Sequence, residues 1–129
     1  AFRPVSAVVG LKGLASMAVT EADTAIAMRS GSVAVLATPR IVALLEQATC
    51  AALQGHLAEG CTTVGMRVQV YHLQPTPVGG TVEAEAILEK IEGRRLTFMV
   101  SASDTKGVVA AGRVTRVLVE VDRFMDKTR

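Results

Sequence analysis

Two titratable side chains occupy positions where the surrounding sequence is apolar. On a helical wheel of residues 38–60, Glu46 lies outside the polar strip, so its carboxylate is expected to be at least partly buried. His72 ends the alternating segment 62–73, on a face that otherwise carries apolar residues: Val64, Met66, Val68 and Val70. A carboxylate and an imidazole on facing elements are typical of an acid–base site with shifted pKa values. Taken alone, each has a plainer interpretation, as a core or strand-end histidine and a rim glutamate.

One long helix is predicted to carry the glutamate. Thr38 is suited to cap it, Pro39 fits its first position, and the pattern ends near Gly55 or Gly60. Its polar strip and its apolar face lie on opposite sides of the wheel: Arg40, Gln47 and Gln54 against Ile41, Leu44, Leu45, Ala48 and Ala52.

Strands are predicted on both sides of this helix, because the period changes from about 3.6 to 2 after Cys61. The expected elements are a first strand over 14–20, a Gly- and Ser-containing connection over 23–37, a strand over 62–73 and three strands within 81–121, with turns at 92–93 and 104–107. We therefore expect an α+β fold in which an antiparallel sheet wraps around one apolar helix.

Length and composition limit the class of protein. The 129 residues fit a single domain spanning 1–129, and a net charge of +2 without long basic runs argues against nucleic-acid binding. No apolar run is long enough to cross a membrane, and residues 1–13 lack the regions of a secretion signal, so we expect a soluble cytoplasmic protein. Cys50 and Cys61 lack metal-ligand spacing and are expected to be packing residues, without a metal site or disulfide.

Three segments resemble the hotdog-fold thioesterases of the fluoroacetyl-CoA thioesterase type: "VLATPRIVALLEQA", "TTVGMRVQVYHLQPTPVGGTV" and "IEGRRLTFMVSASD". The resemblance runs from about Val19 to the final "RFM". It implies that Thr38, Glu46 and His72 are catalytic, and that Gly65 and Arg116 contact substrate. It also implies a hotdog fold, an acyl-CoA substrate, and a homodimer whose sites are completed across the subunit interface, with a tetramer left open.

The residue types suit thioester hydrolysis. Glu46 would deprotonate a water or attack the carbonyl itself, and His72 would act as the base for that water or hold the carbonyl oxygen. Backbone amides at the start of the helix would stabilise the oxyanion. The Thr38 hydroxyl has two candidate roles, helix capping and orientation of Glu46 or substrate. Coenzyme A enters only as part of the substrate, and no other cofactor is expected.

The chain departs from the family where the acyl group would be covered. The segment "RSGSVAVLAT" has no phenylalanine, and Gln47, Met66 and Val114 replace residues expected of the family. We expect Val33, Val35 or Leu36 to set the acyl chain length. Arg116 has an alternative interpretation as a solvated strand-end arginine, and Gly65 as a glycine that relieves crowding where the strand passes the helix.

Three function classes follow. The leading one is an acyl-CoA thioesterase for a small or medium acyl group. An enoyl-CoA hydratase would need an Asp and a His near the helix start, and no histidine precedes His56. The third is a non-catalytic acyl-CoA-binding or sensing module.

Overall fold

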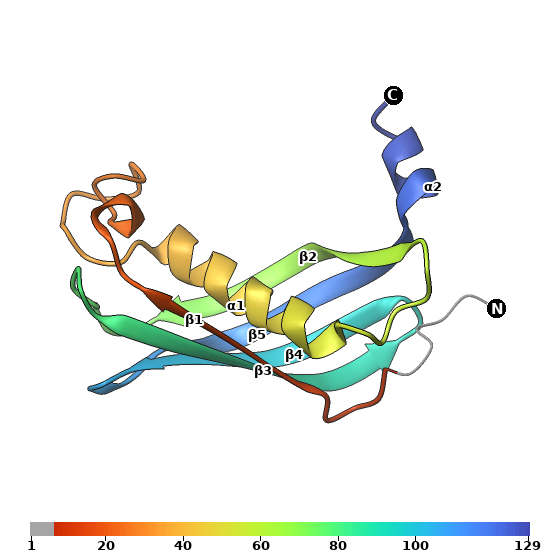
Figure 1. The fold of residues 1–129 in the computed structure, drawn as a ribbon, viewed down its shortest axis with the longest axis horizontal. Coiled ribbons are helices and arrows are strands. Elements are labelled where there is room, and N and C mark those ends of the chain that lie inside the picture. Colours follow the sequence, from red (N-terminus) through yellow and green to blue (C-terminus); the bar gives the residue numbers. More distant parts are fainter. Residues whose placement is uncertain (1–6) are drawn as a thin grey trace.

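The computed structural model describes residues 7–129, and residues 1–6, part of the segment considered for a secretion signal, lie outside it. Five antiparallel strands form one curled sheet in the order β1-β3-β4-β5-β2 (Figure 1). Their bounds are β1 Lys12–Ala18, β2 Cys61–His72, β3 Thr81–Glu92, β4 Arg95–Asp104 and β5 Gly107–Glu120. The predicted order of strand, helix and four strands is confirmed, with tight turns between β3 and β4 and between β4 and β5.

Helix α1, Thr38–Leu53, lies against the concave side of the sheet (Figure 1). Its predicted apolar face is confirmed, because all five residues are buried in the core: Ile41, Leu44, Leu45, Ala48 and Ala52. Gly13 of β1 passes so close to the helix that an added Cβ would collide with the backbone at Ala48 and Ala52. The small residues on both sides therefore allow the strand and the helix to pack at short range.

The start of α1 differs from the prediction. Ala37, in extended conformation, is the N-cap, and no side chain makes a capping hydrogen bond. The predicted capping role of Thr38 is therefore wrong, since Thr38 is already the first helical residue and its hydroxyl has another partner. The other end agrees with the prediction: the helix stops at Leu53, and Gly55 adopts a positive φ of 79°.

A β-bulge changes which side chains of β2 face the helix. Gly65 pairs with Arg116 and Arg67 with Thr115, so Met66 is the extra residue. One extra residue shifts the alternation, because side chains of a strand point to opposite faces in turn. Val64 and Met66 therefore do not share the face of His72, as the sequence pattern predicted; Gly65 does, lying over the carboxylate of Glu46.

The connection before α1 is held to the rest of the molecule. It contains the short helix η1, Glu21–Asp23, and two isolated bridges pair Thr24 with Leu36 and Val35 with Pro77. Asp23 Oδ1 accepts a hydrogen bond from Arg40 Nε at 3.2 Å, which ties this connection to the first turn of α1. These contacts place residues 29–38, the cover segment that would lie over the acyl group, beside the helix start.

Two further features were not predicted. A short helix α2, Val121–Asp126, follows β5 and projects away from the sheet (Figure 1). Cys50 is exposed rather than packed in the core, and neither it nor Cys61 forms a disulfide within residues 7–129. In that same range, none of the helices has the length and apolar character needed to span a membrane.

Candidate functional site

Thr38 and His72 meet at the first turn of α1. Thr38 Oγ1 lies 2.8 Å from His72 Nδ1, a hydrogen bond between residues 34 positions apart in the chain. His72 is the last residue of β2, pairs with the buried Ala110 of β5, and is thereby aimed at the helix start. The prediction that these two side chains share one site agrees with this geometry.

Burial favours the neutral form of the His72 imidazole. Desolvation lowers its pKa from the ordinary value, and the backbone of Gln74 opposes this by a smaller amount. Nε2 is buried, and no hydrogen-bond partner for it exists among the described residues. When Thr38 donates to Nδ1, the ring hydrogen resides on Nε2, which then becomes a donor without a protein partner. Such a group is suited to a substrate oxygen.

A cavity of about 320 Å³ opens beside this pair. Thr38 and His72 line it together with all three residues predicted to contact the acyl group, Val33, Val35 and Leu36. Leu36 is buried, whereas Val33 is 59 % exposed. The sequence prediction for the cover segment therefore agrees with the lining of the cavity. Leu73, Gln74 and Pro75 also line it and were not predicted.

Glu46 lies two turns further along α1, in contact with a buried arginine. Its Oε2 accepts a hydrogen bond from Arg116 Nη1 at 3.1 Å, and its side chain is 34 % exposed, as the helical wheel predicted. Arg116 is only 7 % exposed, so its alternative interpretation as a solvated strand-end residue is wrong. A buried guanidinium of this kind requires full hydrogen bonding, because an unpaired buried charge is costly.

Gly65 provides the space for this ion pair. A Cβ at position 65 would lie 2.5 Å from Glu46 Oε2 and 3.8 Å from Arg116 Nη1. The crowding expected at Gly65 is present, but it comes from the Glu46 carboxylate rather than from the helix backbone. The glycine that relieves crowding between strand and helix is Gly13.

The two clusters are separate within one chain. Thr38 and Glu46 are eight residues apart on α1, which corresponds to about 12 Å along the helix axis. Across residues 7–129, no hydrogen bond or ion pair joins Glu46 to Thr38 or His72. One chain therefore presents a hydroxyl–imidazole pair at one position and a carboxylate–guanidinium pair at another.

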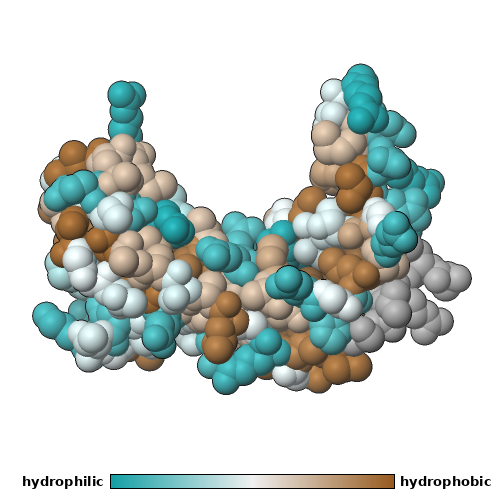
Figure 2. Space-filling view, viewed as in Figure 1, coloured by the Kyte–Doolittle hydropathy of each residue, from teal (hydrophilic) through white to brown (hydrophobic). Residues whose placement is uncertain are grey.

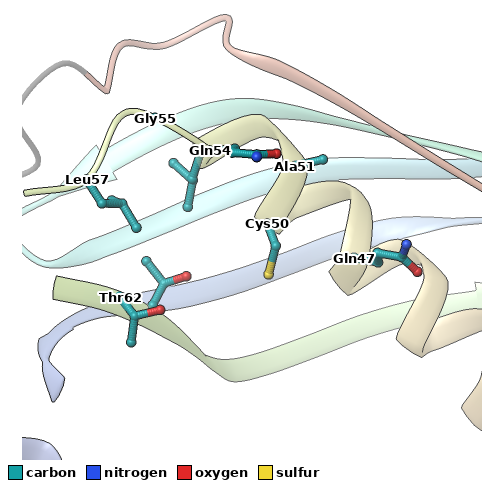
Figure 3. Close-up of a pocket in the computed structure, with 9 residues that line it drawn as sticks. Gln47, Cys50, Ala51, Gln54, Gly55, Leu57 and Thr62 are labelled. Atoms are coloured by element: carbon teal, nitrogen blue, oxygen red, sulfur yellow. The ribbon is translucent and has the colours of Figure 1, made fainter. Parts of the chain in front are cut away.

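A second cavity, of about 490 Å³, lies on the Glu46 side of the molecule. It is bounded by the second half of α1 and the start of β2, with Gln47, Cys50, Thr62 and Thr63 among its lining residues. Figure 3 shows the Cys50 thiol pointing from α1 toward β2, between Gln47 and Gln54. Neither Glu46 nor Arg116 lines this second cavity, whereas Thr38 and His72 both line the first.

Thr63 is a site residue that the sequence analysis missed. It is buried, and both its hydroxyl and its carbonyl oxygen accept hydrogen bonds from Arg116. The available signal was its position two residues before Gly65, which places both on one face of the strand. Threonine is common in strands, so this signal becomes specific only once Arg116 is known to be buried.

Most of the chain matches known proteins in sequence. The profile of the family described as fluoroacetyl-CoA-specific thioesterase matches residues 19–122. A fluoroacetyl-CoA thioesterase from Streptantibioticus cattleyicolor is 36 % identical over 95 residues, which cover 74 % of this chain and 68 % of that protein.

Solved structures agree with the sequence comparison. The fluoroacetyl-CoA thioesterase FlK superposes with a TM-score of 0.90 at 29 % identity, covering 96 % of both chains. A hot-dog-like protein from Thermanaerovibrio acidaminovorans gives a TM-score of 0.85 at 28 % identity, covering 93 % of this chain and 89 % of that one. The predicted hotdog architecture, a curled sheet with one long helix, is confirmed.

Proposed function

Because this chain belongs to the fluoroacetyl-CoA-specific thioesterase family, we propose that it hydrolyses acyl-CoA thioesters that carry a small or medium acyl group. The observation that carries the proposal is the Thr38–His72 pair at the wall of an acyl-sized cavity. A threonine variant of the structurally similar FlK has been solved in complex with acetyl-CoA, which supports this substrate class. The binding-module alternative is not favoured by these relatives.

Hydrolysis requires an electron-rich oxygen at the thioester carbon and a donor at its carbonyl oxygen. Glu46 supplies the first, either by attacking the carbonyl carbon or by taking the proton of an attacking water. The C–S bond then breaks and coenzyme A leaves as the thiolate, which takes a proton. When Glu46 is the nucleophile, the acyl group is left on it as an anhydride, and water then hydrolyses this bond and frees the carboxylate. Either route consumes one water for each carboxylic acid released. Coenzyme A is part of the substrate, and the reaction needs no further cofactor.

His72 supplies the donor. An ionised carboxylate can only accept hydrogen bonds, so Glu46 cannot stabilise the oxyanion. With Thr38 donating to Nδ1, the neutral imidazole presents Nε2–H to the carbonyl oxygen. Thr38 therefore fixes the tautomer and the ring orientation. In the first turn of α1, the N–H groups of Arg40 and Ile41 already donate to the Ala37 carbonyl oxygen and Pro39 has no N–H, so the Thr38 N–H is the remaining backbone donor.

A second copy of the chain completes the site. β2 forms one edge of the sheet, and Met66, Val68 and Tyr71 on this strand are exposed. An unpaired edge with apolar side chains favours pairing with another strand. Figure 2 shows a broad hollow between the lobe of residues 19–37 and α2, with β2 along its floor in the ribbon view. The hollow can receive the partner subunit.

The register of this pairing is the one that brings Glu46 of one copy close to His72 of the other. If two β2 strands pair antiparallel about a two-fold axis between Val68 and Gln69, Gly65 of each copy faces the partner's His72. Glu46, which lies over Gly65, then approaches the Thr38–His72 pair of the other subunit. The acyl cavity of one chain would then meet the Glu46–Arg116 pair of the other chain in one site. The exposed thiol of Cys50 suits the reducing cytoplasm, where we place this activity.

The first test is turnover. Release of free coenzyme A from acetyl-, butyryl- and phenylacetyl-CoA should be enzyme-dependent, and binding without thiol release would contradict the proposal. Light scattering should give at least twice the mass of one chain.

The second test addresses the shared site. Glu46→Gln and His72→Ala homodimers should both be nearly inactive. A heterodimer purified through two different tags has one intact site of two, and should recover about half of the wild-type turnover. A heterodimer as inactive as its parents would show that each site is built within one chain.

A further inference from the structure

Thr63 holds the guanidinium of Arg116 by two acceptors from a single residue. Arg116 Nε donates to Thr63 Oγ1 at 2.8 Å, and Arg116 Nη2 donates to the Thr63 carbonyl oxygen at 3.0 Å. These two donors form one edge of the planar fork. Thr63 is 8 % exposed and Arg116 7 %, so water does not compete freely for these hydrogen bonds.

The opposite side of the same guanidinium meets Glu46. With Nε and Nη2 fixed by Thr63, the planarity of the group also fixes the direction of Nη1, which donates to Glu46 Oε2 at 3.1 Å. Glu46 itself sits on a helix, whereas Thr63 and Arg116 sit on neighbouring strands of the sheet. The threonine therefore anchors to the sheet an arginine that in turn orients a helical carboxylate.

This arrangement leaves one carboxylate oxygen for chemistry. Oε2 is occupied by Arg116 and lies above Gly65, and Oε1 accepts no hydrogen bond within residues 7–129. Rotation of the carboxylate would break the bond to Nη1, so the position of the free oxygen depends on where Nη1 is held.

We propose that Thr63 is a positioning residue: its hydroxyl fixes Arg116, and through Arg116 it sets the orientation of the Glu46 carboxylate toward the thioester. The inference rests on the proposed role of Glu46 in turnover. Thr63 is not among the residues that line the acyl cavity beside Thr38 and His72, so its removal should affect kcat more than KM.

The test compares three variants at position 63 in the full-length protein with acetyl-CoA. Thr63→Ser keeps the oxygen acceptor, Thr63→Cys replaces it with a weak one, and Thr63→Val keeps the shape and has none. We expect kcat to fall in the order Ser, Cys, Val, with a loss of about tenfold to a hundredfold for Val, the range for one hydrogen bond to a charged group. KM should change by less than about threefold, because Thr63 does not line the acyl cavity.

The matched control is Thr115→Val. Thr115 precedes Arg116 on β5, is half-buried, and contacts Thr97 rather than the guanidinium. This change should leave kcat within about twofold of wild type. Equal losses in Thr115→Val and Thr63→Val would overturn the inference. So would equal kcat values for the Ser, Cys and Val variants.

A double-mutant cycle shows whether the effect passes through the arginine. In an Arg116→Lys background the fork is gone, so adding Thr63→Val should cost less than about twofold. The same loss in both backgrounds would mean that Thr63 acts independently of Arg116 and would overturn the inference. A folding defect of Thr63→Val would lower activity in both backgrounds, and thermal unfolding of each variant would detect it.

Failure of the inference is separable from failure of the proposed function. Absence of turnover in the wild type, or full activity of Glu46→Gln, would refute the proposed function and this inference with it. An inactive Glu46→Gln together with a fully active Thr63→Val would refute this inference alone.

Discussion

At the first turn of α1, Thr38 and His72 form a neutral hydrogen bond beside a cavity, whereas two turns further along, Glu46 is bonded to the buried guanidinium of Arg116. In the first region, desolvation lowers the pKa of the imidazole and so favours its neutral form. The second depends on charge pairing, which keeps a carboxylate in one orientation. One helix thus carries both Thr38, bonded to the imidazole, and Glu46, bonded to the guanidinium, and about two turns separate the two contacts.

The largest expected effect comes from the charged region. Glu46→Gln keeps the size of the side chain but removes its negative charge, so turnover should fall by about 10² to 10⁴. Acyl-CoA binding, measured by calorimetry, should persist, because the cavity wall is built by other residues. Wild-type turnover in Glu46→Gln would show that the two regions do not share the chemistry.

A smaller loss of turnover is expected from substitutions of His72 and Thr38. His72→Ala removes the Nε2 donor and should lower kcat by about 10² to 10³, the range for one oxyanion donor. Thr38→Ser should retain most of the activity, whereas Thr38→Val should lose more, since only serine can donate to Nδ1. Equal activity of the two Thr38 variants would argue against control of the tautomer by threonine.

Substitutions at two glycines should distinguish an effect on turnover from an effect on stability. Gly65→Ala places a methyl group against the Glu46 carboxylate, which is the mobile end of a side chain, so we expect about a tenfold loss of turnover with little change in thermal unfolding. Gly13→Ala instead meets helix backbone and should lower the free energy of unfolding by about 1–3 kcal/mol or more. The opposite pattern would contradict the placement of the carboxylate over Gly65.

The pH dependence should reveal the burial of His72. Its folded-state pKa lies below the unfolded value of about 6.5, so the neutral form is favoured by folding. The stability that results is present above pH 6.5 and is lost as pH falls through the lower folded pKa. Compared with His72→Gln, wild type should therefore lose unfolding free energy more steeply below pH 6.5 in urea titrations. Parallel curves for the two proteins would contradict a buried neutral histidine.

The smallest effects concern acyl selectivity. A pocket of aliphatic side chains discriminates by about 1–3 kcal/mol for a whole methylene, and fluorine is close to hydrogen in size. The cover segment contains no aromatic residue, so we expect modest preferences in kcat/KM among fluoroacetyl-, acetyl- and butyryl-CoA. Val35→Ala should shift the kcat/KM preference toward butyryl-CoA by up to about tenfold. Val33→Ala should shift it by less, because Val33 is exposed. A preference for fluoroacetyl-CoA of many thousandfold would refute this.

Local pattern was sufficient for much of the fold. The apolar face of α1, its end near Gly55 and the hairpins of the last three strands follow from periodicity and turn residues, which act between near neighbours in the chain. The partly buried position of Glu46 was also predicted from this local periodicity. The alternation of β2 was not, because a bulge depends on pairing with β5 and has no local signature in this sequence.

The sequence by itself determined the elements, the family resemblance and the candidates Thr38, Glu46 and His72, since these rest on residue types at fixed spacing. Tertiary structure alone decided what each candidate touches. The hydroxyl of Thr38 is committed to a residue 34 positions away, and the guanidinium of Arg116 to residues 53 and 70 positions away. Contacts at such separations arise only when strands and helix pack together, so the role of Thr63 and the burial of Arg116 could not be derived from local sequence.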